Sequence, residues 1–204
     1  MKLLYGSQNF GYDTPESDKD WLEFVYPTWE DIVSNNMKNK ERKNEDGSVT
    51  KVKDIRLIIK MVEKSNFNDL QVLYSQEMYG CEDLKWFIDN RDALVKHNLH
   101  QLFYTNKGYI LSCLKSGTQK DLVRALAFTN MIVKAFNENE FVMREPKFSK
   151  IREANSQEFN ECKEYIYKKL SEYEGFAYAL DKDNTIIDMA RLEVERLLKN
   201  HLIK

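Results

Sequence analysis

The chain has 204 residues, 31% of them charged, and a formal net charge of −2, so its overall charge does not favour nonspecific nucleic-acid binding. This length can bury a proper core in one large or two small domains, no apolar run reaches membrane-spanning length, and the first residues lack a signal-peptide pattern. The three cysteines are widely separated with no Cys-x-x-Cys pair, which favours a reduced, cytoplasmic setting and disfavours a structural zinc site.

The first segment predicts a strand over residues 1–5, a turn at Gly6-Ser7, and a loop that returns into Asp18 and Asp20. Side chains in a strand alternate between faces, so these two carboxylates are expected to point the same way. Adjacent carboxylates repel each other unless a cation lies between them, and Mg²⁺, or alternatively Mn²⁺, is held by such acids together with substrate phosphates. Gly6 lets a backbone approach a phosphate, and Ser7 offers a hydroxyl and an amide to its oxygens.

Residues 21–26 predict a second strand, and Thr28 is placed to cap a short helix. Residues 34–48 form the most polar stretch of the chain and lack apolar periodicity. We therefore expect a mobile loop above the site, although the Asp46-Gly47 pair inside it is also typical of a hairpin. Its basic residues could contact a nucleic-acid backbone, but a solvated loop is the favoured interpretation. They are Lys38, Lys40, Arg42 and Lys43.

The middle of the chain predicts a third strand over residues 49–53 and a helix over 54–65, whose apolar residues recur with helical spacing. Lys60 lies on another face of that helix, in a row of basic residues. If this face lines a cleft, the row can meet a triphosphate; otherwise it is a solvated helix surface.

From residue 69 onward the chain turns helical, with a brief extended segment near residues 140–144. The fold class that follows is α+β, a small mixed β-sheet packed against a mainly α-helical C-terminal part. The domain boundary is placed near residue 80, which gives a core over residues 1–80 and a helical domain over residues 81–204. The expected helices span residues 82–97, 99–115, 120–137, 156–173 and 186–202.

One pattern in the chain carries a family resemblance. Gly6-Ser7, ten intervening residues and then Asp18-x-Asp20 resemble the signature of the DNA polymerase β-like nucleotidyltransferase superfamily. The longer form resembles a branch of predicted nucleotidyltransferases found in phages and bacteria, some of them associated with RNA ligases. The resemblance is tight over residues 6–20 and loose elsewhere. The further positions that carry it are Asn9, Gly11, Thr14, Ser17, Lys60, the stretch from Lys64 to Ser75, Lys120, Arg124, Val142 to Arg144, Ile151 and Arg152.

This resemblance implies transfer of a nucleoside monophosphate from an NTP to an acceptor hydroxyl, with an RNA end or a protein as the acceptor. Asp18 and Asp20 would hold two metal ions, Mg²⁺ or Mn²⁺, and Asp54 is the candidate third carboxylate. The implied nucleotide-binding residues are Gly6, Ser7, Asn9, Ser17, Lys60 and Arg124. The alternative for Asp54, which the sequence slightly favours, is the N-cap of the helix beginning at Ile55.

Two departures from the branch keep other functions open. Asn66-Phe67 stands where the branch has Asn-Pro, and Gln71 stands where it has Glu. The same fold could therefore serve as a catalytically degenerate module that binds a nucleotide or a partner, or as an antitoxin-like or structural protein. Other chemistries have weaker support, since the chain has no P-loop and no kinase motif. His97 and His100 have no metalloprotease-type Glu nearby, which favours a packing role for them.

Overall fold

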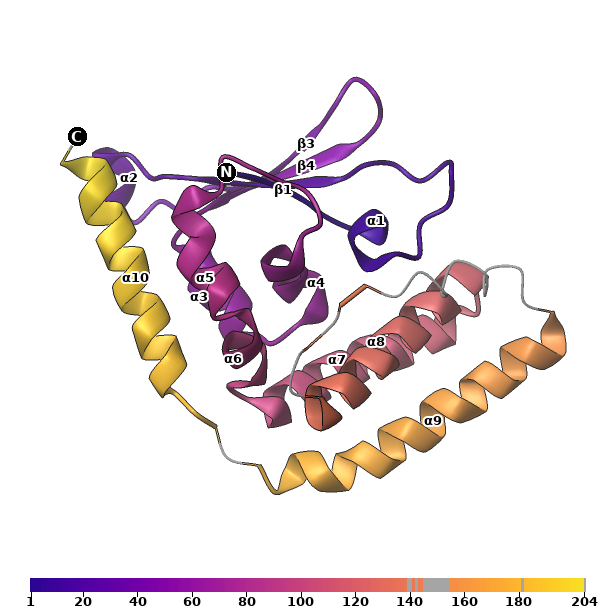
Figure 1. Cartoon of the computed structure of the whole chain (residues 1–204). Helices are drawn as coiled ribbons and strands as arrows, with labels where there is room; N and C mark the ends of the chain where they lie inside the picture. Colours follow the sequence, from indigo (N-terminus) through magenta and orange to yellow (C-terminus); the bar gives the residue numbers. More distant parts are fainter. Residues whose placement is uncertain (139–140, 142, 145–154, 181, 204) are drawn as a thin grey trace.

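The computed structural model describes residues 1–138, 141, 143–144, 155–180 and 182–203. It has the predicted α+β architecture, in which a mixed five-stranded sheet of order β3-β4-β2-β1-β5 packs against helices (Figure 1). β1 is antiparallel to both β2 and β5, β2 is parallel to β4, and β3 is antiparallel to β4. The strands are β1 (Lys2–Leu4), β2 (Trp21–Val25), β3 (Asn39–Lys43), β4 (Val49–Asp54) and β5 (Met78–Tyr79).

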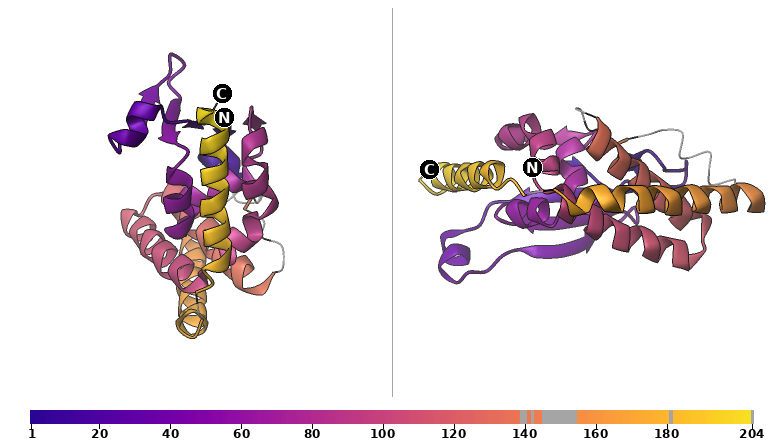
Figure 2. Two further views of the ribbon diagram at one scale, coloured as in Figure 1. Left: turned by 90° about the vertical axis from the view of Figure 1, so that its left-hand side faces the viewer. Right: turned by 90° about the horizontal axis from the view of Figure 1, so that it is seen from below.

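The helices follow the apolar periodicity of the second half of the chain. The long helices α7, α8 and α9 pack against one another, and α10, yellow in Figures 1 and 2, packs against α3 and α6. The helical elements are α1 (Ser7–Phe10), α2 (Trp29–Val33), α3 (Leu57–Glu63), α4 (Phe67–Leu70), η1 (Gln71–Tyr74), η2 (Glu82–Leu84), α5 (Lys85–Asp89), α6 (Arg91–Lys96), α7 (Leu99–Ser116), α8 (Gln119–Asn137), α9 (Ser156–Tyr178) and α10 (Thr185–Leu202).

The sheet presents two different faces because its side chains alternate. In β2, Leu22 and Phe24 are buried against the apolar core, whereas Trp21 and Glu23 point to the other face and stay partly exposed. At the end of β2 the chain enters α2 through the capping box predicted at Thr28. The hydroxyl of Thr28 accepts a hydrogen bond from the backbone N–H of Asp31, and the carboxylate of Asp31 accepts one from the backbone N–H of Thr28.

The prediction of a loop over residues 34–48 is wrong for its centre, because β3 forms there as an edge strand. All five residues of β3 are exposed, so apolar alternation could not mark it. The hairpin indicated by Asp46-Gly47 is present. Asp46 accepts hydrogen bonds from the backbone and hydroxyl of Ser48, and Gly47 takes a left-handed φ of 89°.

Several helix boundaries also differ from expectation. A single helix was expected over residues 82–97, but the chain breaks at Asn90, between α5 and α6. α9 runs through Gly175, and no neighbouring atom lies within 4 Å of where a Cβ would stand there. Of the extended segment expected at residues 140–144, only residues 141, 143 and 144 are described, and residues 142, 151 and 152 of the resemblance lie outside the described residues.

One apolar cluster joins both parts of the chain. Phe10 of α1 lies 5.4 Å from Phe128 of α8, ring centre to ring centre, and the buried cluster extends from Leu3 to Leu197. The boundary near residue 80 stays a prediction. Among the described helices, none is both long and apolar enough to cross a bilayer.

Candidate functional site

A cavity of about 700 Å³ lies where the N-terminal turn, the β3–β4 hairpin and the start of α8 meet. It brings together residues more than a hundred positions apart in sequence, including six of the nine predicted site residues. Those six are Gly6, Ser7, Ser17, Asp18, Asp20 and Arg124. The other lining residues are Tyr5, Phe10, Tyr12, Thr14, Glu16, Glu41, Val49, Lys51, Asn68, Gln71 and Lys120.

 Six predicted site residues therefore share one cavity, and the remaining three, Asn9, Asp54 and Lys60, do not line it.

The Gly6 turn is held open by a buried glutamine. The N–H of Gly6 donates to Oε1 of Gln71 at 2.8 Å, and Nε2 of Gln71 donates to the carbonyl of Asn68 at 2.9 Å. Gly6 has a φ of 83°, and a Cβ added to it would stand 3.2 Å from Oδ2 of Asp20. Glycine is therefore required here both by the left-handed backbone and by the closeness of a carboxylate. Because the N–H of Gly6 is already used, the hydroxyl and amide of Ser7 are the donors left for a ligand.

Asp18 and Asp20 precede β2 rather than belonging to it, yet both line the cavity. The carbonyl of Asp20 accepts from the N–H of Tyr5 at 2.9 Å, which extends the β1–β2 pairing beyond the strand ends. Oδ1 of Asp20 accepts from the N–H of Val49 at 2.9 Å, so the carboxylate is fixed to β4 while Oδ2 faces Gly6. Asp18 is exposed, and neither acid has an ion pair with a cation in the described part of the chain.

Basic side chains at the start of α8 complete the cavity. Lys120 and Arg124 lie one turn apart on α8, and Arg124 Nη1 is 3.2 Å from Oδ1 of Asp121. Lys120 is exposed and forms no ion pair within the described ranges. Burial raises the pKa of the Tyr12 hydroxyl, and the neighbouring Arg124 guanidinium opposes that rise. Tyr12 is therefore a neutral hydroxyl at physiological pH and does not neutralise the charge of Arg124.

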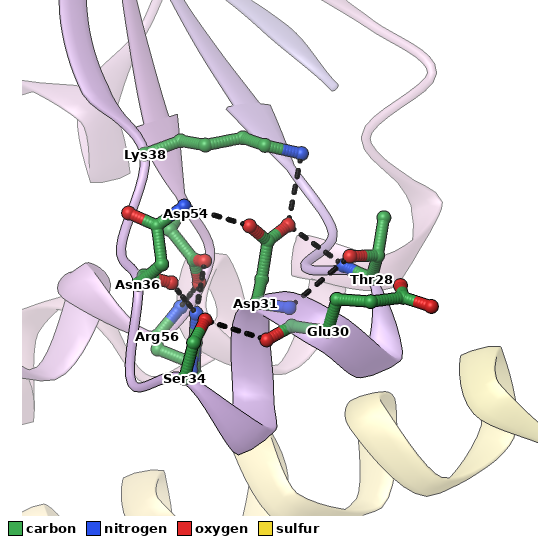
Figure 3. Close-up of polar contacts among 8 residues, drawn as sticks. All are labelled: Thr28, Glu30, Asp31, Ser34, Asn36, Lys38, Asp54 and Arg56. Atoms are coloured by element: carbon green, nitrogen blue, oxygen red, sulfur yellow. Dashed lines mark hydrogen bonds and ion pairs between the residues drawn. The ribbon is translucent and has the colours of Figure 1, made fainter.

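Asp54, the candidate third carboxylate, does not line this cavity. It ends β4, three residues after the cavity residue Lys51, which places it about 10 Å along the strand from the site. Figure 3 shows it paired with Arg56, whose Nη2 is 2.7 Å from Oδ2 and whose Nε and backbone N–H each lie 2.9 Å from Oδ1. The side chain is fully buried, and it holds the turn before α3, close to the capping role that was the alternative.

Neighbouring polar contacts fix the same corner of the fold. Asp31 accepts from Lys38 Nζ at 3.1 Å and from Asn36 Nδ2 at 2.8 Å, and Arg56 also donates to the carbonyl of Asn36 at 2.5 Å (Figure 3). Lys38, one of the basic residues of the expected loop, therefore ties α2 to the chain that enters β3.

Asn9, Lys60 and Ser17 have structural positions that the resemblance alone did not reveal. Asn9 is buried and does not line the cavity, because Nδ2 donates to the carbonyl of Gln71 and Oδ1 accepts from the N–H of Gln76, each at 3.0 Å. Lys60 lies on the exposed side of α3, away from the cavity. Ser17 does line it, but its hydroxyl also accepts from the N–H of Thr14 at 2.8 Å and so shapes the loop.

Sequence reasoning missed Glu41 and Lys51 as residues of the cavity. They are directly opposite in the β3–β4 register, and Lys51 Nζ lies 3.6 Å from Oε1 of Glu41 and 4.6 Å from the centre of the Tyr5 ring. Glu16, in the loop before Asp18, was also missed. The alternation of residues 49–53 could have marked Lys51, whereas nothing marked Glu41 once residues 34–48 were taken as a loop.

The donor set of the cavity suits a hard divalent cation. Asp18 and Asp20 supply carboxylate oxygens, and the absence of a side chain at Gly6 leaves Oδ2 of Asp20 unobstructed. Among the described residues, no three or more His, Cys, Asp or Glu side chains are grouped so as to hold a metal by themselves. Two carboxylates are nevertheless the usual protein contribution to Mg²⁺ when substrate phosphates supply further ligands.

Comparison with protein-family models, with curated proteins and with solved structures finds no match to this chain.

Proposed function

We propose that the protein is a metal-dependent nucleotidyltransferase, which moves a nucleoside monophosphate from an NTP to an acceptor hydroxyl on an RNA end or a protein. One observation carries the proposal: a single cavity holds the Gly6-Ser7 turn, the acids Asp18 and Asp20, and the basic start of α8. Carboxylates at one side and basic side chains at the other suit a polyphosphate whose charge is shared between metal ions and basic side chains.

Each group then has a definite task. Lys120 and Arg124 bind the phosphates of the NTP, and Ser7 donates to a phosphate oxygen that approaches over Gly6. Asp18 and Asp20 would hold Mg²⁺ or Mn²⁺, which when bound lowers the pKa of an acceptor hydroxyl and neutralises charge on the departing pyrophosphate. Transfer of this kind depends mainly on positioning and charge stabilisation, so the chain needs no covalent nucleophile.

A catalytically degenerate nucleotide-binding module is the second candidate, and two observations favour it. Asp54 lies outside the cavity, and the described residues contain no three-acid metal group. Glu41 does line the cavity, but it is engaged with Lys51. Such a module would still bind a nucleotide through Lys120 and Arg124.

The decisive experiment supplies each NTP, labelled at its α-phosphate, with Mg²⁺ or Mn²⁺ and a panel of RNA ends and proteins. We expect label transfer that falls about 100-fold or more in Asp18→Asn and in Asp20→Asn, because each loses charge stabilisation at the reacting phosphate. Asparagine at position 20 can still accept from the N–H of Val49, so the fold is retained. Asp89→Asn, which changes an exposed acid paired with Lys85, is the matched control.

Binding measurements separate the two candidates. Calorimetric titration with a non-hydrolysable NTP should show affinity reduced about tenfold or more in Lys120→Ala and Arg124→Ala, since charge-assisted hydrogen bonds to phosphate are lost. Nucleotide binding without transfer to any acceptor supports the degenerate module. Absence of both binding and transfer contradicts both candidates and leaves the structural role.

A further inference from the structure

The sheet face opposite the apolar core carries a row of aromatic and basic side chains. The register places Lys40, Val52, Glu23, Lys2 and Tyr79 in one row across the five strands, and Arg42, Thr50, Trp21 and Leu4 in the next. We call the set Lys2, Lys19, Trp21, Glu23, Lys40, Arg42 and Tyr79 the Trp21 face. None of these side chains lines the cavity, so this surface is separate from the site described above.

Two aromatic rings lie side by side on the Trp21 face. The ring centres of Trp21 and Tyr79 are 5.7 Å apart, and Tyr79 is 57% exposed. Flat aromatic side chains on an open sheet surface can stack with unpaired bases, an interaction that tolerates any base because every base has a π-face. Tyr79 is exposed and Trp21 is partly exposed, and both lie on the side of β2 that faces away from the core.

The charges around these rings favour an anionic ligand. Lys2 and Lys19 place their Nζ atoms 4.4 Å and 5.3 Å from the centre of the Trp21 ring. Lys40 and Arg42 are exposed on the same side of β3. The acids near them are Glu23, 3.8 Å from Arg42, Glu77, 2.7 Å from Lys19, and Asp46, which interacts electrostatically with Lys2. Basic groups therefore outnumber acids locally, although the whole chain is slightly acidic.

Lys19 links the Trp21 face to the cavity. Lys19 lies over Trp21, while its neighbours Asp18 and Asp20 line the cavity. We propose that the Trp21 face binds a single-stranded nucleic acid and directs its end around this edge toward the cavity. The proposal that this bound strand is the acceptor rests on the proposed function, whereas the proposal that the Trp21 face binds a strand does not. A duplex would present no unstacked bases to Trp21 and Tyr79, and an acidic peptide would have none.

The test measures fluorescence anisotropy of a labelled, unstructured RNA with the full chain tagged at its C-terminus, without NTP or metal. We expect binding that weakens about tenfold in Trp21→Leu and in Tyr79→Ala, because each removes one stacking contact. Lys2→Gln/Lys19→Gln should weaken binding and reduce its salt dependence. Tyr79 is exposed, so its variant is expected to keep the fold even where Trp21→Leu does not, which circular dichroism checks. Lys163→Gln, a lysine 4.7 Å from the Phe159 ring on α9, is the matched control.

Three outcomes would overturn the inference: no binding at about 100 µM protein, equal binding of a duplex, or binding of polyglutamate that is as tight and equally insensitive to Tyr79→Ala. The double variant Asp18→Asn/Asp20→Asn separates a failure of strand binding from a failure of the proposed enzyme, because it should lose transfer and keep strand binding. Strand binding retained in a chain that shows no transfer with any acceptor supports the Trp21 face and contradicts the enzyme. Transfer without strand binding does the reverse.

Discussion

The molecule holds two kinds of carboxylate close to its sheet, and they differ in how completely they are satisfied. Asp54 and Asp31 stand in the polar corner of Figure 3, surrounded by donors from Arg56, Lys38 and the backbone. Asp18 and Asp20 stand at the cavity, where only Oδ1 of Asp20 has a hydrogen-bond donor in the described structure. A carboxylate that is already saturated contributes to the fold, whereas an open one can bind a cation or ligand.

The largest effect is expected from removing the partner of the buried acid. Arg56→Ala leaves the carboxylate of Asp54 buried without its charge partner, which should lower the free energy of unfolding by about 3 kcal/mol. Urea denaturation measures the change. Arg42→Ala is the control, because its 3.8 Å pair with Glu23 is exposed and should contribute less than about 1 kcal/mol. An equal loss of unfolding free energy in Arg56→Ala and Arg42→Ala would contradict the view that the buried Asp54–Arg56 pair stabilises the fold more than a surface pair does.

Two glycines test whether the open carboxylates at the cavity belong to a ligand site. Gly6→Ala and Gly47→Ala both place a side chain at a left-handed φ, and each should cost about 1 kcal/mol of stability. Only at Gly6 does the new Cβ meet a neighbour, Oδ2 of Asp20 at 3.2 Å. Gly6→Ala should therefore also weaken Mg²⁺ or NTP binding in calorimetric titration, while Gly47→Ala leaves it unchanged. Unaltered binding in Gly6→Ala would show that the turn is not part of the ligand site.

The smallest effect is a pH dependence confined to the polar corner. The backbone N–H of Thr28 and the ammonium of Lys38 hold the pKa of Asp31 well below its ordinary value of about 3.9. Since this pKa is depressed in the folded state, the stabilisation is complete above the unfolded value and is lost as the pH falls below it. The melting temperatures of the parent and Asp31→Asn should therefore differ at pH 7, and the difference should shrink progressively as the pH falls below about 4. A constant difference across this range would contradict the proposed pairing.

Local patterns were sufficient for much of the architecture. The apolar spacing near residues 99–115, 120–137 and 186–202 predicted α7, α8 and α10 to within about two residues, because each helix buries one continuous stripe. Thr28 identified its helix start through side-chain chemistry that acts over only three residues. β3 was missed because an edge strand exposed on both faces leaves no such stripe.

Some residues of the candidate site could be predicted from the sequence, and the positions of others could not. The turn at Gly6-Ser7 and the acids Asp18 and Asp20 could be named from sequence, because their proximity is set by a short strand, a turn and a return. The positions of Asp54, Lys60 and Asn9 could not be, since a residue's distance from the cavity depends on strand direction and helix rotation.

The sequence by itself determined the helical periodicity, the capping of α2 and the conjunction of a glycine turn with two acids, all of which are local properties of the chain. Only the tertiary structure decided that α8 brings Lys120 and Arg124 to those acids, that β3 adds Glu41, and that Arg56 withdraws Asp54 from the site. The physical reason is that packing and strand register join segments far apart in sequence. Those contacts leave no repeating pattern in any single segment.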